Sequence, residues 1–174
     1  MRSFSEPIKE KALELGFDKV GIAPAGALAA EGERLNGWLG REFHGEMGWM
    51  EREPEKRSDP RLLLPGARSV VAVAMNYFTP HDHDAAEGKG KISRYAWGDD
   101  YHDVLERILK RFERALGGTK SWRYVDTGPL SDRAHAAQAG LGWIGKNGML
   151  ISDEIGSYFF IGTLVTALEN DITS

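Results

Sequence analysis

The stretch WRYVDTGPLSDRAHAAQAGLGWIGKNGMLISDEIGSYFFIGTL, residues 122–164, decides how the rest of the chain is interpreted. Tyr124 and Val125 favour a short strand, and Asp126 ends it where residues 127–129, Thr-Gly-Pro, force a turn. The sequence therefore predicts a carboxylate held by a rigid turn at a strand end, which is a suitable place for acid chemistry.

The residues after this turn predict a helix and then a glycine-rich loop. Ser131 can cap a helix that is rich in alanine and ends at Gly140. The glycines at 140, 142, 145 and 148 suggest a loop whose backbone approaches something flat or bulky, with Lys146 and Asn147 as side-chain donors. This loop matches neither a P-loop nor the dinucleotide-binding fingerprint, so an ordinary strand, turn, helix and loop remains the alternative.

Composition indicates one globular domain. The chain has 174 residues, 41% of them hydrophobic and 28% charged, with a formal net charge of -4. Nucleic acid must therefore contact a local basic patch or a part not present here. The chain has no cysteine, no apolar run long enough to cross a membrane and no signal peptide, so we expect a cytoplasmic location without membrane association.

The pattern of apolar residues predicts a layered α+β fold. We expect strands near residues 18–22, 69–77, 121–126, 148–152 and 157–166. We expect helices near residues 5–15, 27–39, 99–116 and 131–139, the second with an apolar stripe that includes Leu35 and Trp38. These elements predict a central, mainly antiparallel sheet with helices on both faces.

Three further groups are candidates for function. The cations Lys56, Arg57, Arg61 and Arg68 lie among prolines in a predicted loop, which suits either recognition of carboxamides or phosphates, or simple solvation. Tyr101 and His102 lie in the first turn of a predicted helix and serve either capping and packing or proton relay. The alternating His and Asp residues 81–84 lie in a flexible loop, and we expect no metal site in this chain.

Four ordered blocks of sequence carry a resemblance to a known family. They are VDTGPLSDRAHAAQAGLGWIGKN, GSYFFIGTL, EKRSDPRLLLPGARSVV at residues 55–71 and KISRYAWGDDYHDVL at residues 91–105. Together they resemble the epoxyqueuosine reductases, cobalamin-dependent iron–sulfur enzymes that perform the last step of queuosine formation in tRNA. The resemblance spans nearly all of residues 45–168.

The resemblance implies a proton donor and a cofactor site. Asp126 is the expected proton donor, and burial against an apolar corrin would disfavour its charged form. Asp132 is the rival acid, although its position in a first helical turn gives it a simpler capping explanation. Base-off cobalamin is expected to contact Arg57, Ser93, Arg94, Tyr95, Asp126, Lys146, Asn147, Gly148, Leu150, Ile161 and Gly162.

The resemblance also implies partners and a domain assignment. Residues 1–174 would be the cobalamin-binding catalytic domain, and a ferredoxin-like module with two 4Fe–4S clusters would be absent, so we expect this chain alone to be inactive. The substrate of the full-length enzyme would be tRNA, the chain a monomer, and the fold similar to the corrin-binding core of reductive dehalogenases. A non-catalytic cobalamin-binding module and a flavin-binding reductase remain alternatives.

Overall fold

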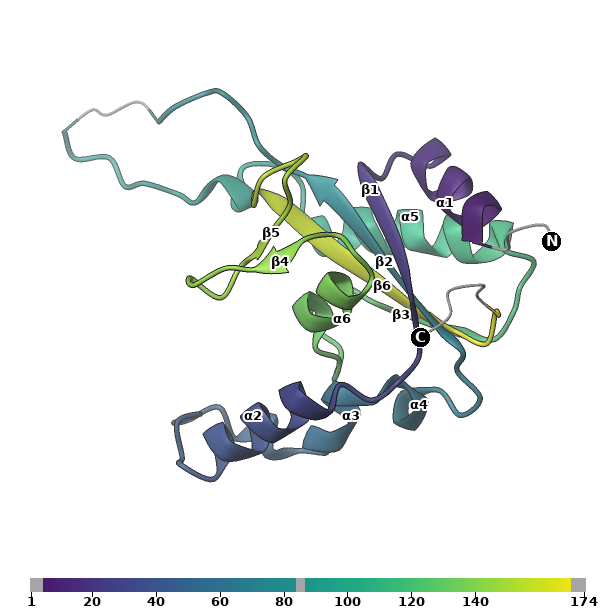
Figure 1. Ribbon diagram of the computed structural model, residues 1–174. Helices are drawn as coiled ribbons and strands as arrows, with labels where there is room; N and C mark the ends of the chain where they lie inside the picture. Colours follow the sequence, from purple (N-terminus) through teal and green to yellow (C-terminus); the bar gives the residue numbers. More distant parts are fainter. Residues whose placement is uncertain (1–4, 84–86, 170–174) are drawn as a thin grey trace.

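A four-stranded antiparallel sheet forms the centre of the computed structural model, which describes residues 5–83 and 87–169 (Figure 1). The strand order is β1-β2-β6-β3, and each neighbouring pair is antiparallel. The bounds of the strands are Lys19–Pro24 for β1, Ser69–Asn76 for β2, Ser121–Tyr124 for β3 and Phe159–Thr166 for β6. The predicted α+β class and antiparallel sheet are confirmed.

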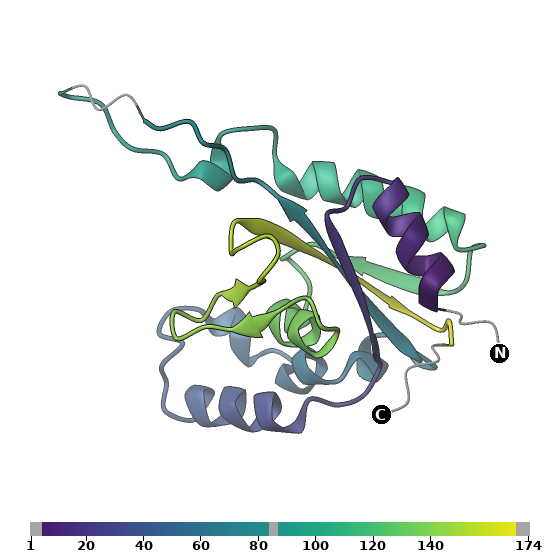
Figure 2. The ribbon, with the colours of Figure 1, turned by 45° about the horizontal axis from the view of Figure 1, so that its top comes forward.

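The first face of the sheet is covered by two helices (Figure 2). These are α1 (Ser5–Glu14) and α5 (Tyr101–Ala115). On α5 the apolar residues Leu105, Leu109 and Phe112 recur at helical spacing and are fully buried against Val71, Val73 and Leu164 of the sheet. These buried contacts fix how the first turn of α5 meets the sheet.

The opposite face packs against α6 (Asp132–Gln138) and a small β-hairpin. The hairpin consists of β4 (Trp143–Ile144) and β5 (Leu150–Ile151). The core between the sheet and this layer contains Ala72, Ala74 and Ala136, whose small side chains allow α6 to approach the sheet closely. Helices therefore cover both faces, as predicted.

The proline-rich segment differs from the expectation of a loop. It forms two short helices, α3 (Pro54–Ser58) and α4 (Pro60–Leu63), each with proline in its first turn. Proline is compatible with a helix start because the amide that it lacks would be unpaired there. A 3-10 turn, η1 (Gly48–Glu51), precedes them.

The helix α2 (Ala29–Leu39) forms as predicted, but none of its residues is fully buried. It packs beside α3 outside the sheet layers, with Gly32 close to Ser58. The expected apolar stripe is therefore only half covered. No helix in the described ranges is both long and apolar enough to cross a membrane.

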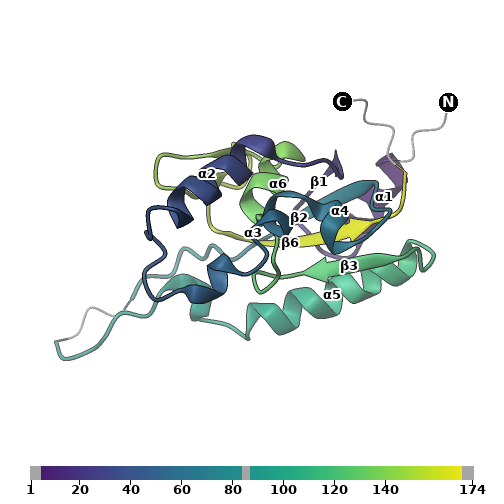
Figure 3. The ribbon, with the colours of Figure 1, turned by 90° about the horizontal axis from the view of Figure 1, so that it is seen from below.

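Between β2 and the 3-10 turn η2 (Arg94–Ala96), residues 77–83 and 87–93 project from one end of the sheet (Figure 2). The helix α5 follows η2 and forms the outermost layer on its side of the molecule (Figure 3). The start of α5 lies at this end of the sheet, where β2 ends and β6 begins, because Tyr101 contacts Phe160.

Candidate functional site

Asp126 lies on a one-residue turn just beyond β3. Its φ is +59°, a left-handed value that is rare outside glycine, and the Thr127 amide donates to the Val125 carbonyl at 2.6 Å. Val125 is buried, and a Cβ at Gly128 would overlap the ring of Tyr124, so both sides of the turn are packed. Left-handed backbone at a non-glycine residue costs about 1–3 kcal/mol, and this packing holds it.

Tyr101 and His102 converge on this carboxylate from the start of α5. The Tyr101 hydroxyl donates to Asp126 Oδ2 at 2.8 Å, and His102 Nε2 lies 3.9 Å from the same oxygen. Asp100 caps the helix by accepting from the His102 amide at 2.9 Å, and the Tyr101 ring stacks on Phe160 at 4.2 Å. The three predicted catalytic residues therefore form one cluster.

Burial and the hydrogen bond to Asp126 both raise the pKa of Tyr101 above its ordinary value. The phenol therefore stays protonated and acts as a fixed donor to the carboxylate. The expectation that Asp126 itself is buried is wrong for the polypeptide alone, because its side chain is 71% exposed. The turn points the carboxylate outward instead of into the core.

Asp132 is more enclosed by the fold than Asp126, and it is only partly exposed. It accepts a hydrogen bond from the Thr163 hydroxyl at 2.9 Å, and Ser131 is the N-cap residue of α6, so the expected capping explanation for Asp132 is not the main one. Burial raises the pKa of Asp132 to about 6; the Thr163 hydrogen bond opposes this rise and the charge of Asp126 adds to it.

Arg57 differs from the other cations of its segment. Lys56 pairs with Glu53, Arg61 with Asp59 and Arg68 with Glu169. Among the described residues Arg57 has no carboxylate partner, its buried Nε has no hydrogen-bond acceptor, and burial lowers its pKa. An unpaired, half-buried guanidinium is therefore available to a ligand.

The main chain of Arg57 and its side chain contact different parts of the site. Its carbonyl accepts from the Ser131 amide at 2.9 Å, which ties α3 to the loop that follows Asp126. Its guanidinium carbon lies 5.2 Å from the centre of the Trp49 ring. Arg57 thus borders the loop that carries the candidate acid.

Ser93, Arg94 and Tyr95 lie at η2, beside a hollow with a volume of about 780 Å³. Ser93 and Arg94 line the hollow with Tyr158, and Tyr95 is exposed nearby. Arg94 pairs with Asp82 at 2.8 Å and lies over the rings of Phe78, Trp97 and Tyr158.

The histidine-rich loop borders the same hollow. His83 packs edge-on against Trp97, and Asp84 lies outside the described residues. In the described part of the chain, no group of three or more histidine, aspartate or glutamate side chains could hold a metal ion.

A row of aromatic rings connects the Asp126 cluster with this hollow. Tyr101 contacts Phe160, Phe160 contacts Tyr77 at 4.5 Å, and Tyr77 contacts Tyr158 at 5.6 Å. Tyr158 is 42% exposed, so the row ends on the surface. The two sets of predicted residues are therefore linked by packed side chains.

Lys146, Asn147 and Gly148 form the tip of the β4–β5 hairpin. Lys146 is exposed, Asn147 Oδ1 accepts from the Met149 amide at 3.1 Å, and Arg133 of α6 donates to the Gly148 carbonyl. A Cβ at Gly142 would overlap the Ile151 carbonyl, so this glycine is required by the hairpin itself. The expected approach of a bulky group is not needed to explain it.

The remaining predicted cofactor contacts lie deeper. Leu150 is buried in the core between the hairpin and the sheet, and Ile161 packs beside it. Gly162 has its Cα on the other face, where a Cβ would crowd Leu109 and Val73. Gly162 is thus separated by the sheet from the hairpin residues.

Two residues of the site were not predicted from the sequence. Thr163 was missed although a polar residue in a strongly apolar strand is a signal that it bonds to something buried. Trp49 was not singled out, because nothing in its local sequence indicates that it lies against Arg57.

Comparisons with known proteins agree on one family. Residues 57–127 match the family described as Epoxyqueuosine reductase QueG, DUF1730. An epoxyqueuosine reductase from Gloeobacter violaceus is 49% identical over 167 residues, which cover 93% of this chain and 51% of the relative. The chain thus spans about half the length of the curated relatives it matches.

Solved structures agree with the sequence match. An epoxyqueuosine reductase bound to an epoxyqueuosine-modified tyrosine tRNA stem loop aligns with a TM-score of 0.84 and 36% identity, covering 98% of this chain and 47% of that one. A Bacillus subtilis epoxyqueuosine reductase, with its aspartate-bearing catalytic loop swung out of the active site, aligns with a TM-score of 0.80 and 35% identity over the same shares.

Proposed function

In sequence and in fold this chain belongs with the epoxyqueuosine reductases, and we propose that it forms the part of such an enzyme that holds the cofactor and donates a proton. The proposed reaction converts epoxyqueuosine to queuosine in the anticodon loop of tRNA. A related enzyme binds an epoxyqueuosine-modified stem loop, which supports tRNA as the substrate.

The chemistry defines what the polypeptide has to supply. Reduction of an epoxide to an alkene takes two electrons and two protons, and the oxygen leaves as water. Bound cobalamin would supply the electrons through its cobalt. The protein has to place an acid beside the departing oxygen and hold the substrate in one orientation.

The convergence of Tyr101 and His102 on Asp126 is the observation that carries this proposal. Asp126 donates the proton, Tyr101 orients its carboxyl group, and His102 places a second ionisable group 3.9 Å from the Asp126 oxygen. The exposed position of Asp126 fits an acid that has to reach a group on a separate macromolecule.

The residues available for cobalamin suit its chemistry. The corrin carries amide side chains, and the unpaired guanidinium of Arg57 and the exposed Lys146 can donate to their carbonyl oxygens. The hollow beside Ser93 and Arg94, of about 780 Å³, is within the usual size range of cofactor sites. We expect base-off cobalamin here, in a core similar to that of reductive dehalogenases.

We expect the electrons to arrive through 4Fe–4S clusters held outside this chain. Such clusters are bound by cysteine thiolates, and these 174 residues contain no cysteine. The isolated chain is therefore expected to bind cobalamin without turning over.

A binding experiment tests the cofactor assignment. Mixing the protein with cob(II)alamin should shift its absorption spectrum to the base-off form, whereas flavin mononucleotide should show no binding. Arg57→Gln should weaken cobalamin binding. Arg61→Gln, in the same segment but with its guanidinium paired to Asp59, should not. Binding of the flavin in place of cobalamin would contradict the proposal.

A further inference from the structure

The outward face of α5 carries four cations at helical spacing. Arg107, Lys110, Arg111 and Arg114 follow at i, i+3, i+4 and i+7, and all four are exposed. Together with Asp103 and Glu106 they line a hollow of about 380 Å³. We call these four cations the α5 stripe.

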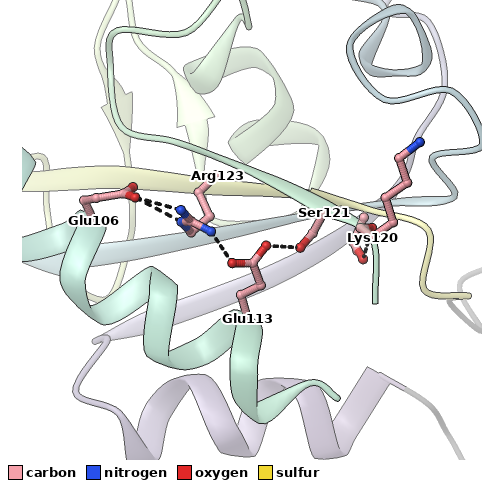
Figure 4. A network of polar contacts seen from close by, with 6 residues as sticks. Glu106, Glu113, Lys120, Ser121 and Arg123 are labelled. Atoms are coloured by element: carbon pink, nitrogen blue, oxygen red, sulfur yellow. Dashed lines mark hydrogen bonds and ion pairs between the residues drawn. The ribbon is translucent and has the colours of Figure 1, made fainter. Parts of the chain in front are cut away.

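Two acidic residues of the same helix, Glu106 and Glu113, are turned toward β3 (Figure 4). Glu106 contacts Arg123 of β3 at 2.9 Å, and Glu113 contacts both Arg123 and Ser121. Arg123 thus pairs with both carboxylates from the sheet side and offsets one of their two negative charges. Because these glutamates are held by Arg123, they are not available to pair with the cations on the outer face.

The cations of the α5 stripe have no such partners. Within residues 5–83 and 87–169, none of the four has an ion pair or a hydrogen bond from its side chain. Asp103, the carboxylate nearest the helix start, lies in the first turn, where the helix dipole favours a negative charge. The helix therefore pairs Glu106 and Glu113 toward the sheet, while its solvent side carries the four unpaired cations with one carboxylate, Asp103, at the helix start.

This face contrasts with the chain as a whole, which has a formal net charge of -4. The α5 stripe extends over roughly 10 Å, since its seven residue steps each rise 1.5 Å. Unpaired cations repeated over such a length suit a polymer with repeated negative charges. The same helix begins at Tyr101 and His102, so a polymer lying along α5 runs toward Asp126.

We propose that the α5 stripe binds the phosphate backbone of the RNA whose modified base is presented to Asp126. This inference rests on the proposed function, because the substrate defines the polymer as RNA. Contacts to phosphates position a nucleic acid without reading its sequence, so the α5 stripe contributes affinity and register and does not select the base.

The test compares two double variants with equal charge loss. Arg107→Gln/Arg111→Gln removes two charges from the α5 stripe. Lys9→Gln/Lys11→Gln removes two from α1, which covers the same face of the sheet and pairs its lysines with Glu6 and Glu14. The probe is an unmodified anticodon-type RNA stem loop, titrated against the protein by fluorescence anisotropy at several salt concentrations.

The α5 variant should bind the stem loop roughly tenfold more weakly near physiological salt, and the slope of log K against log salt should fall by about one to two units. A stem loop with a scrambled loop sequence should show the same loss. The α1 variant should match the wild type in both quantities.

The contrary outcomes separate this inference from the proposed function. Equal RNA binding by the wild type and the α5 variant would overturn the proposed role of the α5 stripe in RNA binding, and it would leave the proposed epoxyqueuosine reductase function unaffected. Binding of polyglutamate in place of RNA would show a surface for an acidic protein and overturn the inference. A protein that binds neither RNA nor cobalamin would overturn both proposals.

Discussion

Replacing Asp132 by asparagine should stabilise the protein at neutral pH. Burial raises the pKa of Asp132 from an ordinary 3.8 to about 6, so the folded protein holds this proton more tightly than the unfolded chain. The stabilising contribution of the protonated Asp132 side chain is therefore fully present below pH 4, and it is lost as the pH rises from about 4 to 6. Asparagine keeps an oxygen that can accept from the Thr163 hydroxyl but carries no charge to desolvate.

The size of the effect follows from the shift. One pKa unit corresponds to about 1.36 kcal/mol, so a shift of roughly two units makes the ionised side chain cost about 3 kcal/mol at pH 7. In a protein of this size that corresponds to a rise of roughly 6–10 °C in the melting temperature of Asp132→Asn. At pH 3.5 the variant and the wild type should have the same melting temperature.

Thermal and urea unfolding followed by circular dichroism at pH 3.5 and pH 7 measure this difference. Glu33→Gln, an equivalent change at an exposed carboxylate on α2, should alter the free energy of unfolding by less than about 0.5 kcal/mol at either pH. The reasoning is refuted if Asp132→Asn is no more stable than the wild type at pH 7, or if its advantage is the same at both pH values.

Two further substitutions test the site and the hairpin that supports it. Tyr101→Phe removes the hydroxyl that donates to Asp126. It should slow epoxide reduction by about tenfold or more and leave cobalamin binding unchanged, because a hydrogen bond to a carboxylate contributes about 1.5–3 kcal/mol. Unchanged turnover would remove Tyr101 from the mechanism. Gly142→Ala should destabilise the protein by about 1–3 kcal/mol, since the added Cβ would overlap the Ile151 carbonyl. In the same urea titration, Gly37→Ala, which lies in open space on α2, should be neutral or stabilising. Equal effects at both positions would contradict the packing described for the hairpin.

The elements that could be predicted from sequence are those whose local pattern matches their burial. β2 is a continuous apolar run and lies in the middle of the sheet, buried on both faces. The observed α5 lies within the helix expected near residues 99–116. The two short helices of the proline-rich segment were missed, because prolines that start a helix were interpreted as marking a loop.

The candidate site was predictable in its members and not in its electrostatics. Asp126, Tyr101 and His102 were identified from the turn, the helix start and the family resemblance, and the fold brings them together. Which carboxylate is enclosed depends on how α6 lies against β6, since Thr163 meets Asp132 across a separation of 31 residues. Local sequence does not contain that contact, so the enclosed position of Asp132 was not predicted, and burial of Asp126 against a corrin stays a prediction.

The role of Asp126 can be measured directly in a complete enzyme that contains this chain and carries cobalamin. Asp126→Asn keeps the size of the side chain and removes its acid, so it should lower epoxide reduction by at least about a hundredfold while the cobalamin spectrum stays that of the wild type. Normal conversion of epoxyqueuosine by this variant would contradict the account, since the proton would then come from another group.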